Sequence, residues 1–181
     1  GNPNHHVTAE METKPTDNGA YFIRWMLDHK PPPTYVKGGG FTGNVDRWQE
    51  FEYVAPSIVL QWSGALEMGR GAQENRDQEG FHLRLLHAAT PETETTTHYF
   101  WSNAYQIPGQ PITEEITDMQ YNQIFTAFHQ DWEVFNKQQE NWDDRPVIDT
   151  IQDASSIAAR KLIDKWVAEE QDASGEAVAA E

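Results

Sequence analysis

The stretch that decides the fold is residues 113–135, TEEITDMQYNQIFTAFHQDWEVF. Its large apolar residues recur at helical spacing with polar residues between them: Ile116, Met119, Ile124, Phe128 and Phe135. This spacing predicts one long helix of about 25–30 residues beginning at Thr113. The run Asp143-Asp144-Arg145-Pro146 is expected to break it.

Upstream of Thr113, apolar and polar residues alternate with the period of two that is typical of β-strands. Six strands are predicted, at residues 7–14, 20–28, 48–54, 57–67, 80–89 and 94–105. The turn signal Asp17-Asn18-Gly19 joins the first two into a hairpin. Residues 29–47, which contain three consecutive prolines and three consecutive glycines, are expected to form a loop, and residues 68–79 a mobile turn.

A second helix is predicted from Ser155, a candidate N-cap, with an apolar stripe that includes Leu162 and Trp166. Six antiparallel strands followed by long helices form an α+β pattern. A curved sheet that packs against the long helix would leave a cavity between them, and ligand pockets favour such places.

The composition narrows the classes of function. The formal net charge of −16 argues against binding to nucleic acid or to anionic membrane surfaces. The absence of cysteine excludes a thiolate metal site or an iron–sulfur cluster within this chain, and it fits a cytoplasmic protein. No apolar run reaches the roughly 20 residues of a membrane span.

Asp131 departs from the pattern of the long helix, because its spacing from Phe128 and Phe135 places a carboxylate on the apolar face. Three interpretations are open. The first is a helix register that differs by one residue, which leaves Asp131 at the boundary of the face. The second is a pair between Asp131 and a buried Arg or His. The third is a metal ion bound by Asp131, for which two histidines are also needed.

His87 ends a strand in which Phe81, Leu83 and Leu85 share its face, so it is expected to point into the core or the pocket. A core histidine with a hydrogen bond and a functional histidine are both compatible with this position. His82 alternates to the other face and is expected to be solvated. The adjacent His5 and His6 are expected near the surface, and His29, His98 and His129 show no partner pattern.

Nucleophile elbows, phosphate-binding glycine loops and His-Glu-x-x-His helices are absent from the sequence. Three stretches resemble the catalytic domain of the vanillate O-demethylase and dicamba O-demethylase group of Rieske oxygenases. The first is LHAATPETE at 86–94, followed by THYFW at 97–101. The second is FHQDWEV at 128–134, and the third is Arg145-Pro146 with the last helix. The likeness covers about residues 5–171.

The resemblance implies a helix-grip fold in which Asp131 is the carboxylate ligand of a mononuclear iron. Gln61 and His87 match positions that contact substrate in the family, and Asn122 falls near a third such position, where a relative has an aromatic residue. The implied reaction is hydroxylation or O-demethylation of an aromatic or other ring-containing molecule with O₂. A reductase or ferredoxin would donate electrons, and the assembly would be a homotrimer.

The family's two iron-binding histidines would fall just before Gly1, and its Rieske [2Fe–2S] domain further upstream. We therefore interpret residues 1–171 as an incomplete catalytic domain and residues 172–181 as a flexible tail. Fe(II) is expected in the full-length protein, whereas this chain alone is expected to bind no iron tightly and to be inactive.

Two other functions compete with this interpretation. A metal-free helix-grip domain could bind an apolar small molecule, although a carrier has no need of a carboxylate at Asp131. A protein-interaction module would instead show a flat apolar patch in place of a cavity.

Overall fold

The computed structural model describes residues 9–76, 80–106, 109, 111–143, 146 and 148–179. The strands are β1 (Glu10–Thr16), β2 (Gly19–His29), β3 (Val45–Val54), β4 (Ile58–Glu67), β5 (Phe81–Pro91) and β6 (Thr97–Gln106). The helices are α2 (Pro33–Gly39), α3 (Ala72–Asn75), α4 (Glu114–Glu140) and α5 (Ala154–Ala179), with a short 3₁₀ turn, η1 (Ile151–Asp153), before α5.

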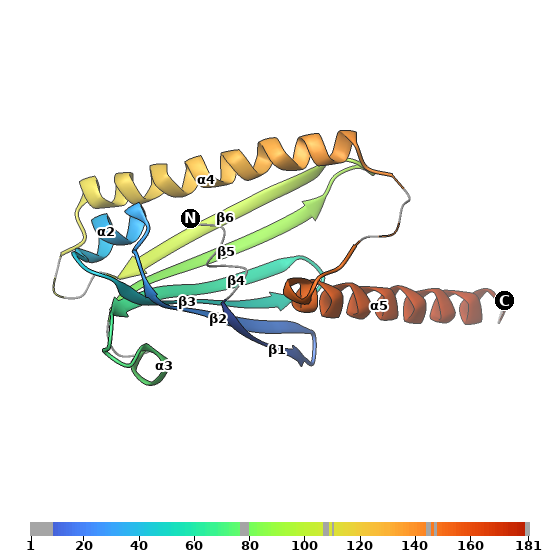
Figure 1. Cartoon of the computed structure of the whole chain (residues 1–181). Coiled ribbons are helices and arrows are strands. Elements are labelled where there is room, and N and C mark those ends of the chain that lie inside the picture. Colours follow the sequence, from blue (N-terminus) through green and yellow to red (C-terminus); the bar gives the residue numbers. More distant parts are fainter. Residues whose placement is uncertain are drawn as a thin grey trace.

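The strands form one antiparallel sheet in which spatial order follows sequence order, β1-β2-β3-β4-β5-β6. The first hairpin closes where the sequence predicts, with Thr16 opposite Gly19. Helix α4 lies over one face of the sheet, with α2 beside its first turns, while α5 begins beside β1 and β2 and then projects past the end of the sheet (Figure 1). The α+β, helix-grip class is therefore confirmed.

We call the face beneath α4 the inner face. Its core joins the α2 and β3–β5 side chains to α4, through Tyr35, Phe41, Val45, Ala65, Phe81, Leu83, Leu85 and Ile124. The period-2 pattern of β5 supplies three of these residues, and the helical pattern of α4 supplies Ile124. Gln120, one turn before Ile124, is fully buried beside Gly38 and Phe81.

The opposite, outer face is also covered, which corrects the expectation for His82. A second core cluster there contains Trp25, Trp48 and Ala72, the last from α3. Trp48 lies beside Gly64, and Gly64 beside His82, in one row across the sheet. Because Gly64 has no side chain, the Trp48 ring reaches across it to the His82 ring, at 5.6 Å between centroids. His82 is therefore buried, not solvated.

The loop expected over residues 29–47 contains helix α2, so that part of the expectation is wrong. Pro33 occupies the first turn, where a missing N–H costs nothing, and Gly40 ends the helix in the left-handed conformation with φ 68°. The prolines and glycines thus flank a short helix, which becomes stable because Tyr35 packs into the core.

The second long helix begins within one residue of the predicted start, but its cap differs. Thr150 and Asp153 form a capping box around η1, so Ser155 is not the N-cap. Helix α5 packs against β1 and β2 and continues to Ala179. Across the described part of the chain, no helix is both long and apolar enough to cross a membrane.

Candidate functional site

The candidate site lies on the inner face, where β4, β5 and β6 bring polar side chains into one hydrogen-bonded row. Gln61 Nε2 donates to Ser63 Oγ at 2.7 Å. Gln61 Oε1 lies 3.3 Å from His87 Nε2, and His87 Nδ1 lies 2.5 Å from the Tyr99 hydroxyl. We call Ser63, Gln61, His87 and Tyr99 the polar row.

The polar row determines the tautomer of His87. Because the amide nitrogen of Gln61 donates to Ser63, its oxygen faces His87 and can only accept. His87 Nε2 therefore carries the proton, and Nδ1 accepts the hydrogen bond donated by Tyr99 O–H. A neutral imidazole is thus held in one orientation on the inner face.

An aromatic wall from α4 and β6 stands over this imidazole. The Phe128 ring lies 5.3 Å from the His87 ring, 5.9 Å from the Tyr99 ring and 5.3 Å from the Trp101 ring. Edge contacts of this kind favour fixed ring orientations. Phe128 therefore places α4 directly above His87 and Tyr99.

Asp131 lies one turn beyond Phe128, within about 20° of Ile124 around the helix. From this position the charge of the Asp131 carboxylate changes the pKa of two residues of the polar row, His87 and Tyr99. Burial lowers the pKa of His87, and the Asp131 carboxylate partly opposes that effect. Burial raises the pKa of Tyr99, and Asp131 raises it further. The carboxylate is thus near both side chains.

The burial expected for Asp131 is not found. Its side chain is exposed, as are those of all residues from His129 to Glu140. The first half of α4 is covered by α2 and the sheet, whereas its second half extends past α2 (Figure 1). Asp131 therefore keeps its hydration and needs no buried partner in this chain.

A single carboxylate offers too few ligands for an iron site. Among the residues that the structure describes, no group of three His, Cys, Asp or Glu side chains is placed to hold a metal ion. Asp131 fits the role of one oxygen ligand, but the described residues do not complete a site. His5 and His6 lie outside the described residues.

The structure does not place Asn122 with the polar row. It lies about 160° around α4 from the buried Ile124, and its side chain is exposed. Of the remaining histidines, His98 and His129 lie near Glu92 and Glu133, at 3.5 Å and 3.9 Å, and His29 is buried.

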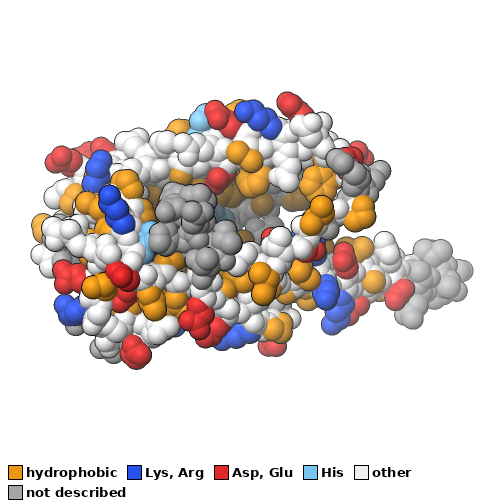
Figure 2. Space-filling view, viewed as in Figure 1, with side chains coloured by type: hydrophobic (Ala, Val, Ile, Leu, Met, Phe, Trp, Pro, Cys, Tyr) orange, Lys and Arg blue, Asp and Glu red, His pale blue; other side chains and the backbone are white. Residues whose placement is uncertain are grey.

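Figure 2 shows a hollow between α4 and the sheet, with hydrophobic side chains at its rim. At the same end of the inner face, a space of about 350 Å³ lies against α5; Tyr53, Ser156, Ala159, Arg160, Ile163 and Asp164 line it. Tyr53 stands two strands from His87 in one row, through Val59. The hollow is thus flanked by α4 and by the beginning of α5.

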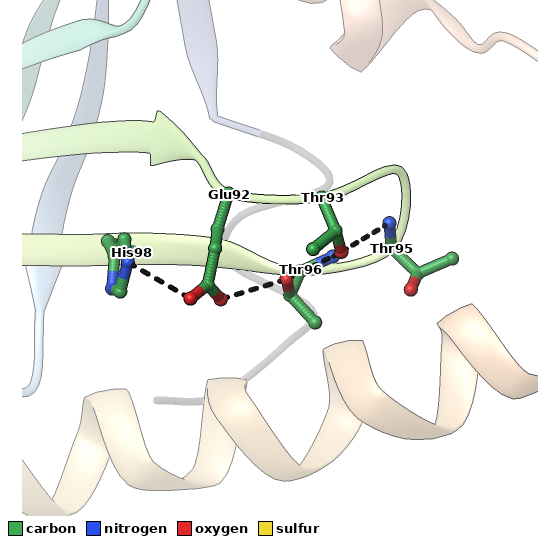
Figure 3. A network of polar contacts seen from close by, with 5 residues as sticks. All are labelled: Glu92, Thr93, Thr95, Thr96 and His98. Carbon is green, nitrogen blue, oxygen red and sulfur yellow. Dashed lines mark hydrogen bonds and ion pairs between the residues drawn. The ribbon is translucent and has the colours of Figure 1, made fainter.

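The side chains of the β5–β6 turn form hydrogen bonds with one another (Figure 3). Thr96 Oγ1 donates to Glu92 Oε2 at 2.9 Å, and Thr93 Oγ1 accepts from the backbone N–H of Thr96 at 3.1 Å. His98 lies beside the other oxygen of Glu92. This network fixes the start of β6, and Tyr99 of the polar row follows directly.

The family model that matches residues 1–169 is the vanillate O-demethylase oxygenase C-terminal domain. The chain belongs to this family. A relative from Comamonas testosteroni, the putative toluene-4-sulfonate monooxygenase system iron-sulfur subunit TsaM2, is 30% identical over 86% of this chain and 46% of its own length. The vanillate O-demethylase oxygenase subunit of Pseudomonas sp. (strain ATCC 19151) is 29% identical over 86% of this chain and 49% of its own length.

Solved structures of dicamba monooxygenase share the fold. The apo structure superposes with a TM-score of 0.70 at 20% identity, over 93% of this chain and 52% of that one. A structure with non-haem iron and dicamba gives 0.56 at 18% identity, over 90% and 50%. The present chain thus spans about half the length of the relatives that it matches.

The sequence pointed to Gln61 and His87 as candidate site residues, and the structure adds Ser63 and Tyr99 as their hydrogen-bond partners. Strand alternation carried a signal for both. Ser63 lies two residues from Gln61, and Tyr99 lies two residues from Trp101, which is opposite His87. The register that joins them is a property of the assembled sheet.

Proposed function

We propose that this chain forms the substrate-binding part of the catalytic domain of a Rieske-type oxygenase. The complete enzyme hydroxylates or O-demethylates an aromatic or other ring-containing small molecule with O₂. The observation that carries the proposal is the polar row beneath α4, with Asp131 acting on His87 and Tyr99. Membership of the family and the oxygenase names of the relatives support it.

Within this chain, the polar row and the aromatic wall would hold the substrate. Gln61 has a second amide N–H with which it would orient a polar substituent, and His87, whose two ring nitrogens are both bonded within the polar row, would contact the substrate through its ring. Phe128 and Trp101 pack against the ring and exclude water from one side. Asn122 stays a predicted contact of this site, although its side chain is exposed in this chain.

A mononuclear iron would supply the activation of O₂ in the complete enzyme, and Asp131 would be one of its ligands. Electrons would come from a Rieske [2Fe–2S] cluster and a reductase or ferredoxin. A homotrimer and a cytoplasmic location belong to the same proposal.

The test uses the complete reading frame that contains this chain. Asp131→Asn should abolish O₂-dependent turnover of aromatic substrates and remove the mononuclear iron, while the absorption spectrum of the iron–sulfur cluster is unchanged. Asp118→Asn, an exposed carboxylate on the same helix, is the matched control and should keep both. Full iron content and turnover in Asp131→Asn would overturn the proposal.

The rival function is a metal-free ligand-binding domain. It is favoured by the hollow in a chain whose described residues hold no complete metal site (Figure 2). A reading frame that encodes neither further iron ligands nor a Rieske segment, together with binding of aromatic compounds that is indifferent to Asp131, would establish the rival.

A further inference from the structure

Aromatic rings form a continuous series from the polar row to the surface of α4, where this helix runs over β5 and β6 (Figure 1). The Tyr99 ring lies 5.9 Å from the Phe128 ring, and the Phe128 ring lies 5.3 Å from the Trp101 ring. Trp101 stacks on Tyr121 with 5.3 Å between the ring centres and 28° between the ring planes. The series therefore links the inner face to Tyr121, whose side chain is 49% exposed.

Three members of the series can each lose one electron. Phenol and indole rings are the most easily oxidised aromatic side chains, and cysteine, which competes with them, is absent from the sequence. Phe128 is not oxidised itself, but its ring fills the space between Tyr99 and Trp101. We call Tyr99, Trp101 and Tyr121 the redox series.

Both ends of the redox series have an outlet for the proton that a phenol releases when it is oxidised. At the inner end, the Tyr99 hydroxyl donates to His87 Nδ1 at 2.5 Å, and the neutral imidazole can take that proton and return it. At the outer end, Tyr121 is exposed and can release its proton to water.

The inner end of the redox series lies near Asp131, the proposed iron ligand. Asp131 is one turn beyond Phe128 on α4, and its charge acts on Tyr99. An oxidant that forms here without a substrate would attack the nearest side chains, and oxidised side chains lose their packing and hydrogen bonds. A path that moves the oxidising equivalent to the surface would prevent this damage.

We propose that Tyr99, Trp101 and Tyr121 carry an oxidising equivalent from the position of Asp131 to the protein surface when no substrate is bound. The inference rests on the proposed function, because that function places the oxidant at Asp131. It gives these rings a protective role that is separate from substrate binding.

Each step moves one electron toward Asp131. Tyr99 loses an electron to the oxidant, and its phenolic proton passes to His87 Nδ1. Trp101 then reduces the Tyr99 radical, which regains its proton from His87. Tyr121 reduces the oxidised Trp101 and releases its own proton to water. A soluble thiol restores Tyr121 by giving up one electron and one proton, and it becomes a thiyl radical.

The test places a one-electron oxidant at the inner end of the redox series without iron. Because the sequence has no cysteine, Asp131→Cys provides a unique attachment point for a ruthenium(II) polypyridyl label. A light flash with hexaammineruthenium(III) as electron acceptor converts the label to ruthenium(III), and electron paramagnetic resonance then identifies the protein radical. A tyrosyl radical should form on Tyr121. Tyr99→Phe and Trp101→Phe should both lose it, and Tyr121→Phe should leave a tryptophan radical in its place.

Trp132→Phe is the matched control, because Trp132 is exposed and adjacent to the label. Its ring reaches Tyr121 by an outer path of stacked rings through His129 and Phe125. This variant should keep the Tyr121 radical. If Trp132→Phe abolishes that radical while Trp101→Phe preserves it, the electron follows the outer path and the proposal is overturned.

Peptide mass spectrometry of the labelled chain after repeated flashes decides the case if a variant unfolds. Oxidation products at Tyr121 support the proposal, whereas products confined to residues next to the label overturn it. Neither overturning result bears on the proposed function, because the label takes the place of the iron. The iron content and turnover of Asp131→Asn in the complete protein test that function separately.

Discussion

Gln61 Oε1 lies 3.3 Å from His87 Nε2, although the two residues are 26 positions apart in sequence. The contact crosses the β4–β5 ladder, where Gln61 pairs with Leu85 and Val59 pairs with His87. Because Ser63 fixes the amide of Gln61, this diagonal contact fixes the imidazole as well.

The His87 imidazole should therefore be the neutral tautomer with its proton on Nε2. Gln61→Leu removes the acceptor, so a mixture of tautomers is expected, and Ser63→Ala should give the same effect more weakly. Nitrogen-15 chemical shifts of the His87 ring at neutral pH measure the populations. A proton on Nδ1 in the parent chain would contradict the hydrogen-bond directions given above.

The stability of the fold should depend on the protonation of His87. Burial lowers the pKa of this side chain below its ordinary 6.5, so the unfolded chain binds the proton more readily than the folded one. This contribution to stability is complete above pH about 6.5 and is lost as the pH falls through 6.5 toward the folded-state pKa.

Urea midpoints measured between about pH 5 and pH 7.5 check this dependence. His87→Gln should flatten the profile in that window, whereas His129→Gln, an exposed residue of α4, is the control and should follow the parent. A parent profile identical to that of His87→Gln would contradict the assignment.

Gly64 should be intolerant of any side chain. A Cβ at this position would lie 2.2 Å from Cζ2 of Trp48 and 2.7 Å from the backbone oxygen of Phe81. Gly64→Ala should therefore lower the free energy of unfolding by about 1–3 kcal/mol or more, through displacement of the Trp48 ring from His82.

Gly43→Ala is the matched control, because no atom lies within 4 Å of its would-be Cβ. Its free energy of unfolding should stay within about 0.5 kcal/mol of the parent value. Chemical denaturation followed by tryptophan fluorescence measures both variants. Equal stabilities for the two variants would show that the Trp48 ring does not pack tightly against Gly64.

The chain by itself should hold much less than one iron per molecule. Asp131 supplies one carboxylate, and a two-histidine, one-carboxylate site needs two further ligands. Anaerobic addition of Fe(II), removal of free metal and elemental analysis give the stoichiometry. One tightly bound iron per chain that survives Asp131→Asn would place the metal elsewhere and remove the basis for the assigned role.

Local patterns predicted most of the fold because they report local geometry. Alternation gave the strands and the inward direction of His87, and the helical spacing of Ile124 and Phe128 gave α4. The same patterns failed at α2, where tertiary packing of Tyr35 outweighs the proline and glycine signals.

The sequence by itself determined the strand periodicity, the long helix and the side of α4 on which Asp131 lies, because these depend on neighbours within a few residues. Only the tertiary structure decided three relationships between distant residues. They are the diagonal contact of Gln61 with His87, the cover of Trp48 over His82, and the packing of Phe128 of α4 against His87 and Tyr99. Each depends on strand register and on which elements cover each face of the sheet, and no single segment encodes either.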